Sequence, residues 1–340
     1  MIFLKSSRAA LAAVAALAIL AGCGGGSQPL SPVAANASAI TFNAAPALHP
    51  NRGKSWMLPG AQKQPSLLYI SNSGTADVTV YTYLNGSGLL LVGTLTGFSL
   101  PTGMCTDRAG HIWIPDYSAG KIYEYAHGGT SPIATITQQN GRPYDCAIDS
   151  STGNLAVANQ LPNGRYSYGN VKVYPKGSKR GTTYFPPYGF RSVDFLAYDN
   201  KSNLFVDGQE LYQPSAQLFE LAKGANELTT MTIDGGALYA PAAINWIKPT
   251  LLLGDQNFEN KGTSGAYKLF ISGSTATVVA TLTFSGTQQM YGFWRRAGRV
   301  IVPDHTGNIV RIYDLSDGSL FSKLTTSISL PFGAVVSQST

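Results

Sequence analysis

The sequence predicts an all-β fold: a six-bladed β-propeller of four-stranded antiparallel blades, closed by a C-terminal strand that joins blade one. Three observations support this prediction. An apolar strand pattern occurs six times, glycine turns follow it at the same period, and the C-terminal segment repeats the start of the second blade. Four-stranded units of about 45 residues are typical of propeller blades.

The first observation is a run of two to four apolar β-forming residues that ends in Asn or Asp. The final residues of the runs are 44, 43, 48, 48 and 49 residues apart. A nearly constant period indicates one supersecondary unit that is repeated along the chain. The six final residues are Asn72, Asp116, Asn159, Asp207, Asp255 and Asp304.

The second observation is a glycine turn after the aromatic strand that follows each run, as in residues 121–125. Tight hairpins need positive φ, which glycine adopts at little cost. A Thr/Val/Ile-rich segment such as 132–137 comes next, so each unit contains four strands, and no segment has a helical period. The glycines are Gly86, Gly128, Gly177, Gly224, Gly273 and Gly318.

The third observation concerns the two ends of the repeat region. Residues 330–336 have the same form as residues 100–105, which open the second blade, but no further strands follow them. Conversely, blade one begins at Leu67 without an opening strand of its own. We therefore expect the C-terminus to supply the innermost strand of blade one, which leaves the ring without a free edge.

Residues 1–22 have the features of a signal peptide. Two positive charges, Lys5 and Arg8, precede an apolar run over residues 9–20. Twelve helical residues rise only about 18 Å, too short for a membrane span of roughly 30 Å. Residues 20–23 (Leu-Ala-Gly-Cys) resemble the lipobox of bacterial lipoproteins, which implies lipidation at Cys23. The alternative is an ordinary secretory signal whose cleavage site falls near a cysteine.

The lipobox resemblance also implies a location. We expect an exported protein that is lipid-anchored in the bacterial cell envelope, in the outer membrane if the host is Gram-negative, because Gly24 rather than Asp follows the cysteine. Residues 23–64 are rich in Gly, Ala, Pro and Ser, and this composition predicts a flexible tether. Within it, the apolar residues 56–58 are expected to dock on the propeller, which we place at residues 65–340.

The composition narrows the function classes. Hydrophobic residues make up 44% of the chain, which supplies a core and excludes general disorder. The net charge of +6 falls to +4 without Lys5 and Arg8, so nucleic-acid binding is not expected. Basic residues are densest in two groups, which we interpret as solubilising surface residues. The first group is Lys176, Lys179 and Arg180, and the second is Arg295, Arg296 and Arg299. The four histidines, His49, His111, His127 and His305, are likewise expected in the tether or in solvated turns.

Cys105 and Cys146 lie near the starts of neighbouring inner strands. In an oxidising envelope a disulfide between them would close a 41-residue loop and stabilise the fold by about 4 kcal/mol. The alternative is a pair of buried free thiols, which are common in protein cores.

Residues 101–107, 110–114 and 120–123 resemble an NHL-type repeat. The same residues are similar to the senescence-marker-protein, gluconolactonase and luciferin-regenerating-enzyme family, grouped with the six-bladed calcium-dependent phosphotriesterase-like propellers. Residues 125–135 and 149–159 further resemble bacterial lipoproteins that carry this type of propeller. The resemblance implies a divalent cation such as Ca²⁺ in the central channel, held in part by the Asp of a Pro-Asp-Gly motif.

Thr102 stands where that family has its metal-binding Asp, which disfavours a metal-dependent hydrolase. Asp145 and Asp194 lie near the starts of the next two inner strands and are weak metal candidates, with solvent-facing turn carboxylates as the alternative. The sequence also lacks a Gly-x-Ser-x-Gly elbow, a phosphate loop and a pair of His at metal-ligand spacing. We therefore predict no catalytic residues and no cofactor, with Ca²⁺ expected only for the hydrolase.

The predicted ligand-binding surface is the channel mouth formed by the loops that lead into the inner strands. Tyr and Arg dominate recognition sites, because they offer large contact areas and polar tips. The alternative is that the aromatic residues wedge the blades together. We predict a non-catalytic binding module for a peptide, a glycan or an envelope protein; the alternative function is a metal-dependent lactonase or phosphoesterase. The predicted binding residues are Arg142, Tyr144, Phe190, Arg191, Tyr239, Tyr291 and Phe332.

Overall fold

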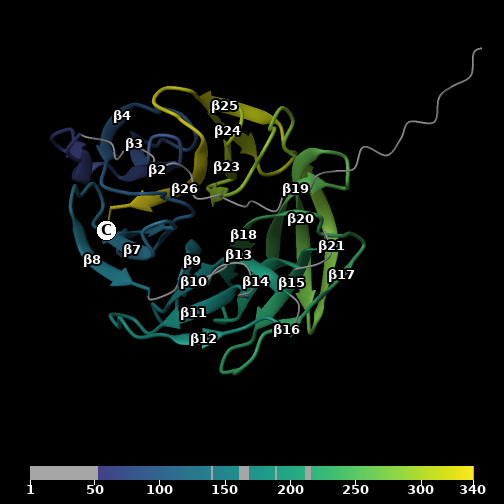
Figure 1. The fold of residues 1–340 in the computed structure, drawn as a ribbon. Coiled ribbons are helices and arrows are strands. Elements are labelled where there is room, and N and C mark those ends of the chain that lie inside the picture. Colours follow the sequence, from purple (N-terminus) through teal and green to yellow (C-terminus); the bar gives the residue numbers. More distant parts are fainter. Residues whose placement is uncertain (1–52, 139–140, 161–167, 188–189, 211–215, 340) are drawn as a thin grey trace, which may run out of the picture. The chain divides into compact units, whose positions relative to one another are not determined.

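Six antiparallel sheets are arranged around a central axis in a computed structural model of the chain (Figure 1). The structure describes residues 53–138, 141–160, 168–187, 190–210 and 216–339, all of which belong to the unit Ala37–Thr340. The sheets are the blades of a six-bladed β-propeller, which confirms the predicted fold class. Within the described residues, no helix is long and apolar enough to cross a membrane.

Each blade contains four strands, which we give in the order of blades one to six. The innermost strands are β26 (Pro331–Gln338), β5 (Cys105–Thr106), β9 (Pro143–Ile148), β13 (Phe190–Tyr198), β18 (Pro241–Ile247) and β22 (Trp294–Arg296). The second strands are β2 (Ser66–Asn72), β6 (Ile112–Asp116), β10 (Leu155–Asn159), β14 (Leu204–Glu210), β19 (Thr250–Phe258) and β23 (Arg299–Asp304).

The outer half of each blade follows the same order. The third strands are β3 (Asp77–Thr82), β7 (Lys121–Tyr125), β11 (Asn170–Tyr174), β15 (Ala216–Leu221), β20 (Thr263–Ser272) and β24 (Ile309–Asp314). The fourth strands are β4 (Leu91–Leu95), β8 (Pro132–Thr137), β12 (Thr182–Tyr184), β16 (Thr229–Thr230), β21 (Thr275–Thr283) and β25 (Leu320–Leu324). A short strand β17 (Thr232–Asp234) adds to blade five in parallel with β21.

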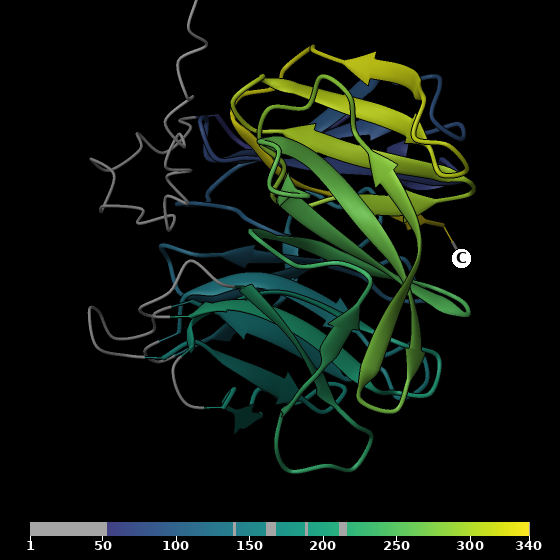
Figure 2. The same cartoon turned by 90° about the vertical axis from the view of Figure 1, so that its right-hand side faces the viewer.

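The ring closes as the sequence predicts. β26 pairs antiparallel with β2, with Leu68 opposite Val336 and Ile70 opposite Ala334. Viewed from the side, blade six (yellow) lies beside blade one (dark blue), so the two ends of the described chain meet in the ring (Figure 2). The inner edge of blade one is therefore covered by the C-terminal strand, which supplies its missing hydrogen-bond partners.

Blade one also gains an outer strand from the segment that the sequence assigned to the tether. β1 (Trp56–Met57) pairs with β4, and the amide of Leu58 donates to the carbonyl of Val92 at 2.7 Å. Gly93 on β4 has no side chain at the point where Met57 packs against it. A short 3₁₀ turn η1 (Ala61–Lys63) then leads into β2, so the folded part begins before residue 65.

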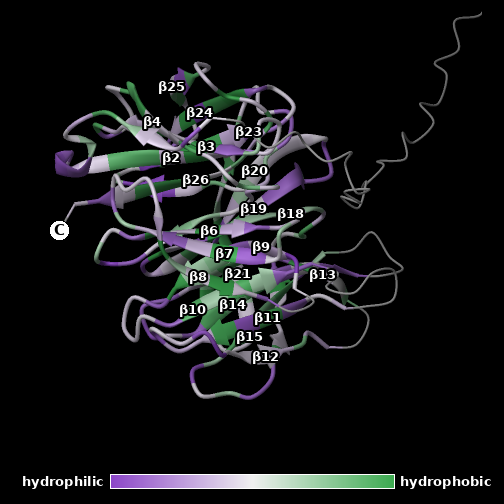
Figure 3. Ribbon diagram, turned by 60° about the vertical axis from the view of Figure 1, so that its left-hand side comes forward, coloured by the Kyte–Doolittle hydropathy of each residue, from purple (hydrophilic) through white to green (hydrophobic). Residues whose placement is uncertain are grey.

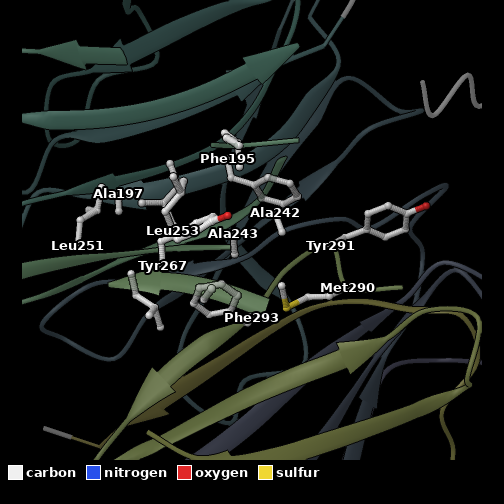
Figure 4. Packing of buried hydrophobic residues seen from close by; sticks show 14 of the residues in the cluster. Phe195, Ala197, Ala242, Ala243, Leu251, Leu253, Tyr267, Met290, Tyr291 and Phe293 are labelled. Atoms are coloured by element: carbon white, nitrogen blue, oxygen red, sulfur yellow. The ribbon is translucent and has the colours of Figure 1, made fainter. Parts of the chain in front are cut away.

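The hairpin turns use glycine as the sequence predicts, and the core is built from apolar strand residues. All six glycines predicted for the hairpins have positive φ, between 56° and 93°. Apolar residues are concentrated on the strands and polar residues on the connecting turns (Figure 3). The largest cluster of buried apolar side chains joins blades four, five and six, and Figure 4 shows part of it. Packing between blades, in addition to packing within each sheet, therefore holds the ring together.

The Asn and Asp residues that define the repeat have a structural role that the sequence did not reveal. The carboxylate of Asp116 is fully buried and accepts hydrogen bonds from the amides of Ser99 and Leu100 at 2.8 and 2.9 Å. These amides belong to the loop that enters the inner strand of the same blade. We call this arrangement the Asx clamp, because the end of the second strand holds the entering loop.

The clamp recurs in three other blades. Asp255 accepts from the amides of Tyr239 and Ala240, Asp304 from that of Gln289, and Asn72 from that of Ser329. Blade four differs, because Asp207 accepts from the amide of Phe195 within β13, next to a β-bulge. In blade three, Asn159 instead donates to the side chain of Asn170 at 3.1 Å.

Blades two and three are also joined covalently. A disulfide links Cys105 of β5 to Cys146 of β9, with the two Cα atoms 5.5 Å apart. Both cysteines lie on inner strands, and both are buried. The bond therefore ties two neighbouring strands of the channel wall.

We expect deletion of residues 331–340 to abolish cooperative unfolding, because β2 would lose its inner partner and the ring would open. Thermal unfolding followed by near-UV circular dichroism measures this. Ser339→Ala, at an exposed position after β26, serves as the control and should leave the transition unchanged. A deletion variant that unfolds as sharply as the wild type, and at the same temperature, would show that closure does not depend on β26.

We expect Asp116→Ala to lower the free energy of unfolding by about 3 kcal/mol, because the amides of Ser99 and Leu100 lose their shared acceptor. Urea unfolding of the variant and the wild type measures the difference. Asp234→Ala, on the exposed strand β17, removes a carboxylate outside any clamp and should change stability by less than about 0.5 kcal/mol. Equal effects of the two substitutions would contradict a special role for the clamp.

Candidate functional site

A cavity of about 1130 Å³ lies along the propeller axis and is lined by inner-strand residues from all six blades. Its lining continues onto the turns that follow the inner strands, at residues 107–109, 150–153 and 199–200. The cavity therefore reaches the face of the propeller at which the inner strands end. It is at least as large as the roughly 300–1000 Å³ of ordinary small-molecule sites.

Aromatic rings fill the other end of the channel, where the inner strands begin. Phe332 stacks on Tyr291 at 4.8 Å between ring centroids and meets Tyr144 edge-on at 4.9 Å. Tyr144 also contacts Phe195 and Tyr117, so rings from five blades take part. Burial raises the pKa of Tyr291 to about 12 and that of Tyr144 well above its usual range. Both phenols are therefore neutral parts of the core at physiological pH.

The structure places the predicted mouth residues at this filled end of the channel or outside it. Tyr144, Tyr291 and Phe332 contact one another in the way that the wedge alternative describes. Phe190 packs edge-on against Phe219 inside blade four, with centroids 4.6 Å apart. None of these four residues lines the cavity.

The remaining predicted mouth residues differ in exposure. Arg142 is exposed, with its guanidinium 5.4 Å from the ring centroid of Tyr117, and Tyr239 is half-buried. Neither lines the cavity. The side chain of Arg191 lies outside the described residues. The cavity thus opens on the face opposite the one that the sequence suggested, because large aromatic residues occupy the start of several inner strands.

Three of the four tryptophans line the cavity: Trp113 from β6, Trp246 from β18 and Trp294 from β22. The indole N–H groups of Trp113 and Trp246 are buried, and neither has a hydrogen-bond acceptor among the described residues. Buried donors without acceptors are unusual in folded proteins, and each costs free energy until it is paired. Both N–H groups are buried away from the open space of the cavity, so a ligand there meets other atoms of these rings.

Charged residues of both signs surround the tryptophans. Lys176 and Lys179 of blade three reach the cavity, as do Arg295 and Arg296 of blade six. The two basic groups that the sequence suggested were solubilising thus contribute to one site. Acidic residues from blades two, three and four face the same space; they are Asp107, Glu124, Asp149 and Asp199.

Asp145 lies in the wall of the cavity, next to Gly103, which leaves room for its carboxylate. One carboxylate oxygen is 3.4 Å from the amide of Leu196. Burial raises the pKa of Asp145 to about 8, partly offset by hydrogen bonds from the amides of Cys146 and Leu196. Without a bound cation, this carboxyl group is therefore mainly protonated at neutral pH.

The second weak metal candidate, Asp194, and Thr102, which replaces the family's metal-binding Asp, point elsewhere. Asp194 accepts hydrogen bonds from Ser192 at 2.8 Å and from Gln160, and it does not line the cavity. The hydroxyl of Thr102 is fully buried, 3.4 Å from the carbonyl of Pro115 and 3.3 Å from that of Pro143. The structure therefore does not bring Thr102, Asp145 and Asp194 together as a set of cation ligands.

One other group of three potential ligands lies close together in the described part of the chain: Asp107, His111 and Glu124. All three line the cavity. Sequence reasoning missed this group and placed His111 in a solvated turn. The strand register nevertheless indicates this proximity. The hairpin of β6 and β7 pairs Glu124 with Trp113, which is two residues after His111, so the side chains of His111 and Glu124 lie on the same face of the hairpin.

Comparison with known proteins supports the fold alone. No protein-family model matches the chain, and no curated protein matches it either. Among solved structures, a chain in the crystal structure of a nidogen/laminin complex superposes with a TM-score of 0.63 at 13% identity. The match covers 81% of this chain and 99% of that chain. The chain therefore has the same propeller fold as a protein whose sequence is very different.

Proposed function

We propose that the protein is a non-catalytic binding module that takes a peptide segment into the central cavity. The observation that carries this proposal is the lining of the cavity, in which three tryptophan side chains stand among charges of both signs. Aromatic rings pack against the apolar parts of a peptide, and ionised side chains or termini pair with such charges. A neutral glycan would desolvate the charged groups without pairing them, which is costly.

The proposal includes the location of the protein. The lipobox-like residues 20–23 suggest an anchor at Cys23 in the bacterial cell envelope, in the outer membrane if the host is Gram-negative. These residues lie outside the described part of the chain. An anchored propeller would present its cavity to extracytoplasmic peptides or to the exposed segments of envelope proteins, and nucleic acid is not expected as a partner.

The alternative proposal, a lactonase or phosphoesterase-like hydrolase of the gluconolactonase-like family, has less support. That chemistry needs a cation that polarises the ester and activates water. Thr102 is buried against carbonyl oxygens, and Asp194 does not line the cavity. These residues favour the binding module over the family's type of metal centre.

We expect the purified chain to bind members of an immobilised random hexapeptide library, and Ala147→Trp to abolish that binding. Ala147 lies on β9 in the cavity wall, so a large ring there would fill the space. Trp246→Ala should weaken binding about 10-fold, because it removes an aromatic contact surface from the cavity wall. Biolayer interferometry measures both effects.

Phe270→Ala is the matched control, because Phe270 is exposed on β20 and does not line the cavity. It should leave peptide binding unchanged. A glycan array screened in parallel tests the competing ligand class. Binding to glycans but not to peptides, or peptide binding that Ala147→Trp leaves intact, would overturn the proposal.

We expect Asp145→Asn to remove a pH dependence of stability between about pH 4 and pH 8. The pKa of Asp145 is raised from 3.8 to about 8 in the folded chain, so over this interval the folded state holds a proton that the unfolded state has lost. The stability that this group contributes is full below pH 3.8 and is lost as the pH rises to about 8. One proton corresponds to at most about 1.4 kcal/mol per pH unit.

Urea unfolding at pH 5, 6, 7 and 8 measures this effect. The stability of the wild type relative to Asp145→Asn should fall steadily across the series. Asp234→Asn, at an exposed position, is the control and should run parallel to the wild type. Parallel curves for Asp145→Asn as well would mean that Asp145 is already ionised in the folded protein, which would restore it as a cation ligand.

A further inference from the structure

Asp107, His111 and Glu124 come together at the end of blade two that faces the cavity. The Nδ1 atom of His111 lies 3.1 Å from Oδ2 of Asp107 and 3.0 Å from Oε1 of Glu124. All three side chains are half-buried and line the cavity, so they are accessible to a small ion and screened from bulk solvent. We call these residues the blade-two triad.

The local fold holds the triad in place. The second oxygen of Asp107, Oδ1, accepts hydrogen bonds from the amides of Ala109 and His111, both at 2.9 Å. The hydroxyl of Thr106 donates to the carbonyl of His111 at 2.8 Å, which fixes the other side of the turn. Glu124 is held on β7, opposite Trp113 of β6. The turn thus leaves one oxygen of Asp107 free to face the imidazole.

The spacing of the donor atoms suits a cation. Ligand atoms about 2.1 Å from a metal ion, in octahedral or tetrahedral arrangement, are about 3.0–3.4 Å from each other. The three donor atoms also lie within 4.8 Å of one another. The same spacing would allow one Nδ1–H to be shared between the two carboxylates, so the geometry alone permits either arrangement.

The charge balance favours the cation. The two carboxylates both lie about one hydrogen-bond distance from the same imidazole nitrogen, so their negative charges share one small site. Among the described residues, no Lys or Arg forms an ion pair with either carboxylate. A protonated imidazole supplies one positive charge for two negative charges, whereas a divalent cation balances both.

Blade four provides an internal comparison. Its turn has the same hydrogen bonds, because Asp199 Oδ1 accepts from the amides of Lys201 and Asn203 at 2.7 and 2.8 Å. Glu220 occupies the place of Glu124, opposite Phe205 on the second strand. In this blade Asn203 stands where blade two has His111, and its amide nitrogen donates to Asp199 Oδ2 at 2.9 Å.

The comparison isolates the histidine. An asparagine at this position is sufficient for the turn, since blade four folds with it. An amide nitrogen can only donate, whereas a neutral imidazole nitrogen can bind a metal ion. Blade two therefore differs from blade four by a residue that adds metal-binding ability and that the turn itself does not need.

We propose that the blade-two triad binds one divalent transition-metal cation of the zinc type, with an open coordination position toward the cavity. Two carboxylate oxygens and one imidazole nitrogen are three protein ligands, the number found in zinc sites that keep a position open. The imidazole favours zinc and its neighbours over Ca²⁺ and Mg²⁺, which prefer oxygen ligands alone. The proposal does not require a bound peptide, although Asp107 and Glu124 are also two of the acidic residues of the cavity wall.

Isothermal titration of the untagged full chain with ZnCl₂, after treatment with a chelator, tests the proposal. We expect one Zn²⁺ per chain and a higher melting temperature with zinc. His111→Asn should weaken zinc affinity by about 100-fold or more and should fold normally, because it reproduces the blade-four arrangement. CaCl₂ at the same concentrations should not compete.

Two further variants separate loss of a ligand from loss of the fold. Glu124→Gln should weaken zinc binding while keeping the metal-free melting temperature within a few degrees of the wild type. Glu220→Gln, the matched change in blade four, should leave zinc binding intact. Co²⁺ in place of zinc should give visible absorption bands that disappear in His111→Asn. No zinc binding by the wild type, or binding that His111→Asn leaves unchanged, would overturn the proposal and leave the triad as an ion pair.

Discussion

The structure depends on the Asx clamp, in which a buried carboxylate or amide at the end of a second strand holds the loop that enters the inner strand. In a propeller this loop carries the chain from the outer edge of one blade to the axis of the next, so its position sets where the inner strand starts. The clamp of Asp116 supplies charge-assisted hydrogen bonds to the amides of Ser99 and Leu100, and the amide of the buried Leu100 would otherwise be unpaired inside the protein. These bonds offset the cost of burying the charge. With the inner strands placed in this way, the walls of the central cavity follow.

The two ends of the channel have different roles because of what each strand end carries. At the end where the inner strands begin, Phe332 contacts both Tyr144 and Tyr291, and these rings fill the axis. At the other end, the turns that follow the inner strands are free of clamps, and their residues differ from blade to blade. A rigid scaffold with variable turns at one end is the usual arrangement for a binding site. The filled end gives the propeller its stability, and the open end is available for a ligand.

The fold could be predicted from the sequence because a propeller repeats one local pattern. Strand type and turn residue can be identified within a single blade, and the period follows from the spacing between equivalent residues of successive blades. The candidate site could not be predicted in the same way. Tyr144 and Phe332 are far apart in the sequence, and their contact follows only from the radius at which six blades close. For the same reason, Lys176 of blade three and Arg295 of blade six could not be assigned to one cavity from the sequence. By contrast, the proximity of His111 and Glu124 lies within one hairpin and could have been found from its register.

Repetition also helps to separate the residues that serve the fold from those that do not. Features that every blade needs, such as apolar second strands and glycine hairpins, are explained by the propeller fold itself. Some residues differ from their counterparts in another blade although the hydrogen bonds of the turn are the same. The needs of the fold do not explain such a difference. His111 is such a residue, because Asn203 makes the corresponding turn in blade four with the same amide hydrogen bonds to its aspartate. Chemistry specific to this chain is therefore best sought where one blade differs from another and the backbone does not. In blade two this difference lies on the wall of the cavity, beside the disulfide that ties β5 to β9.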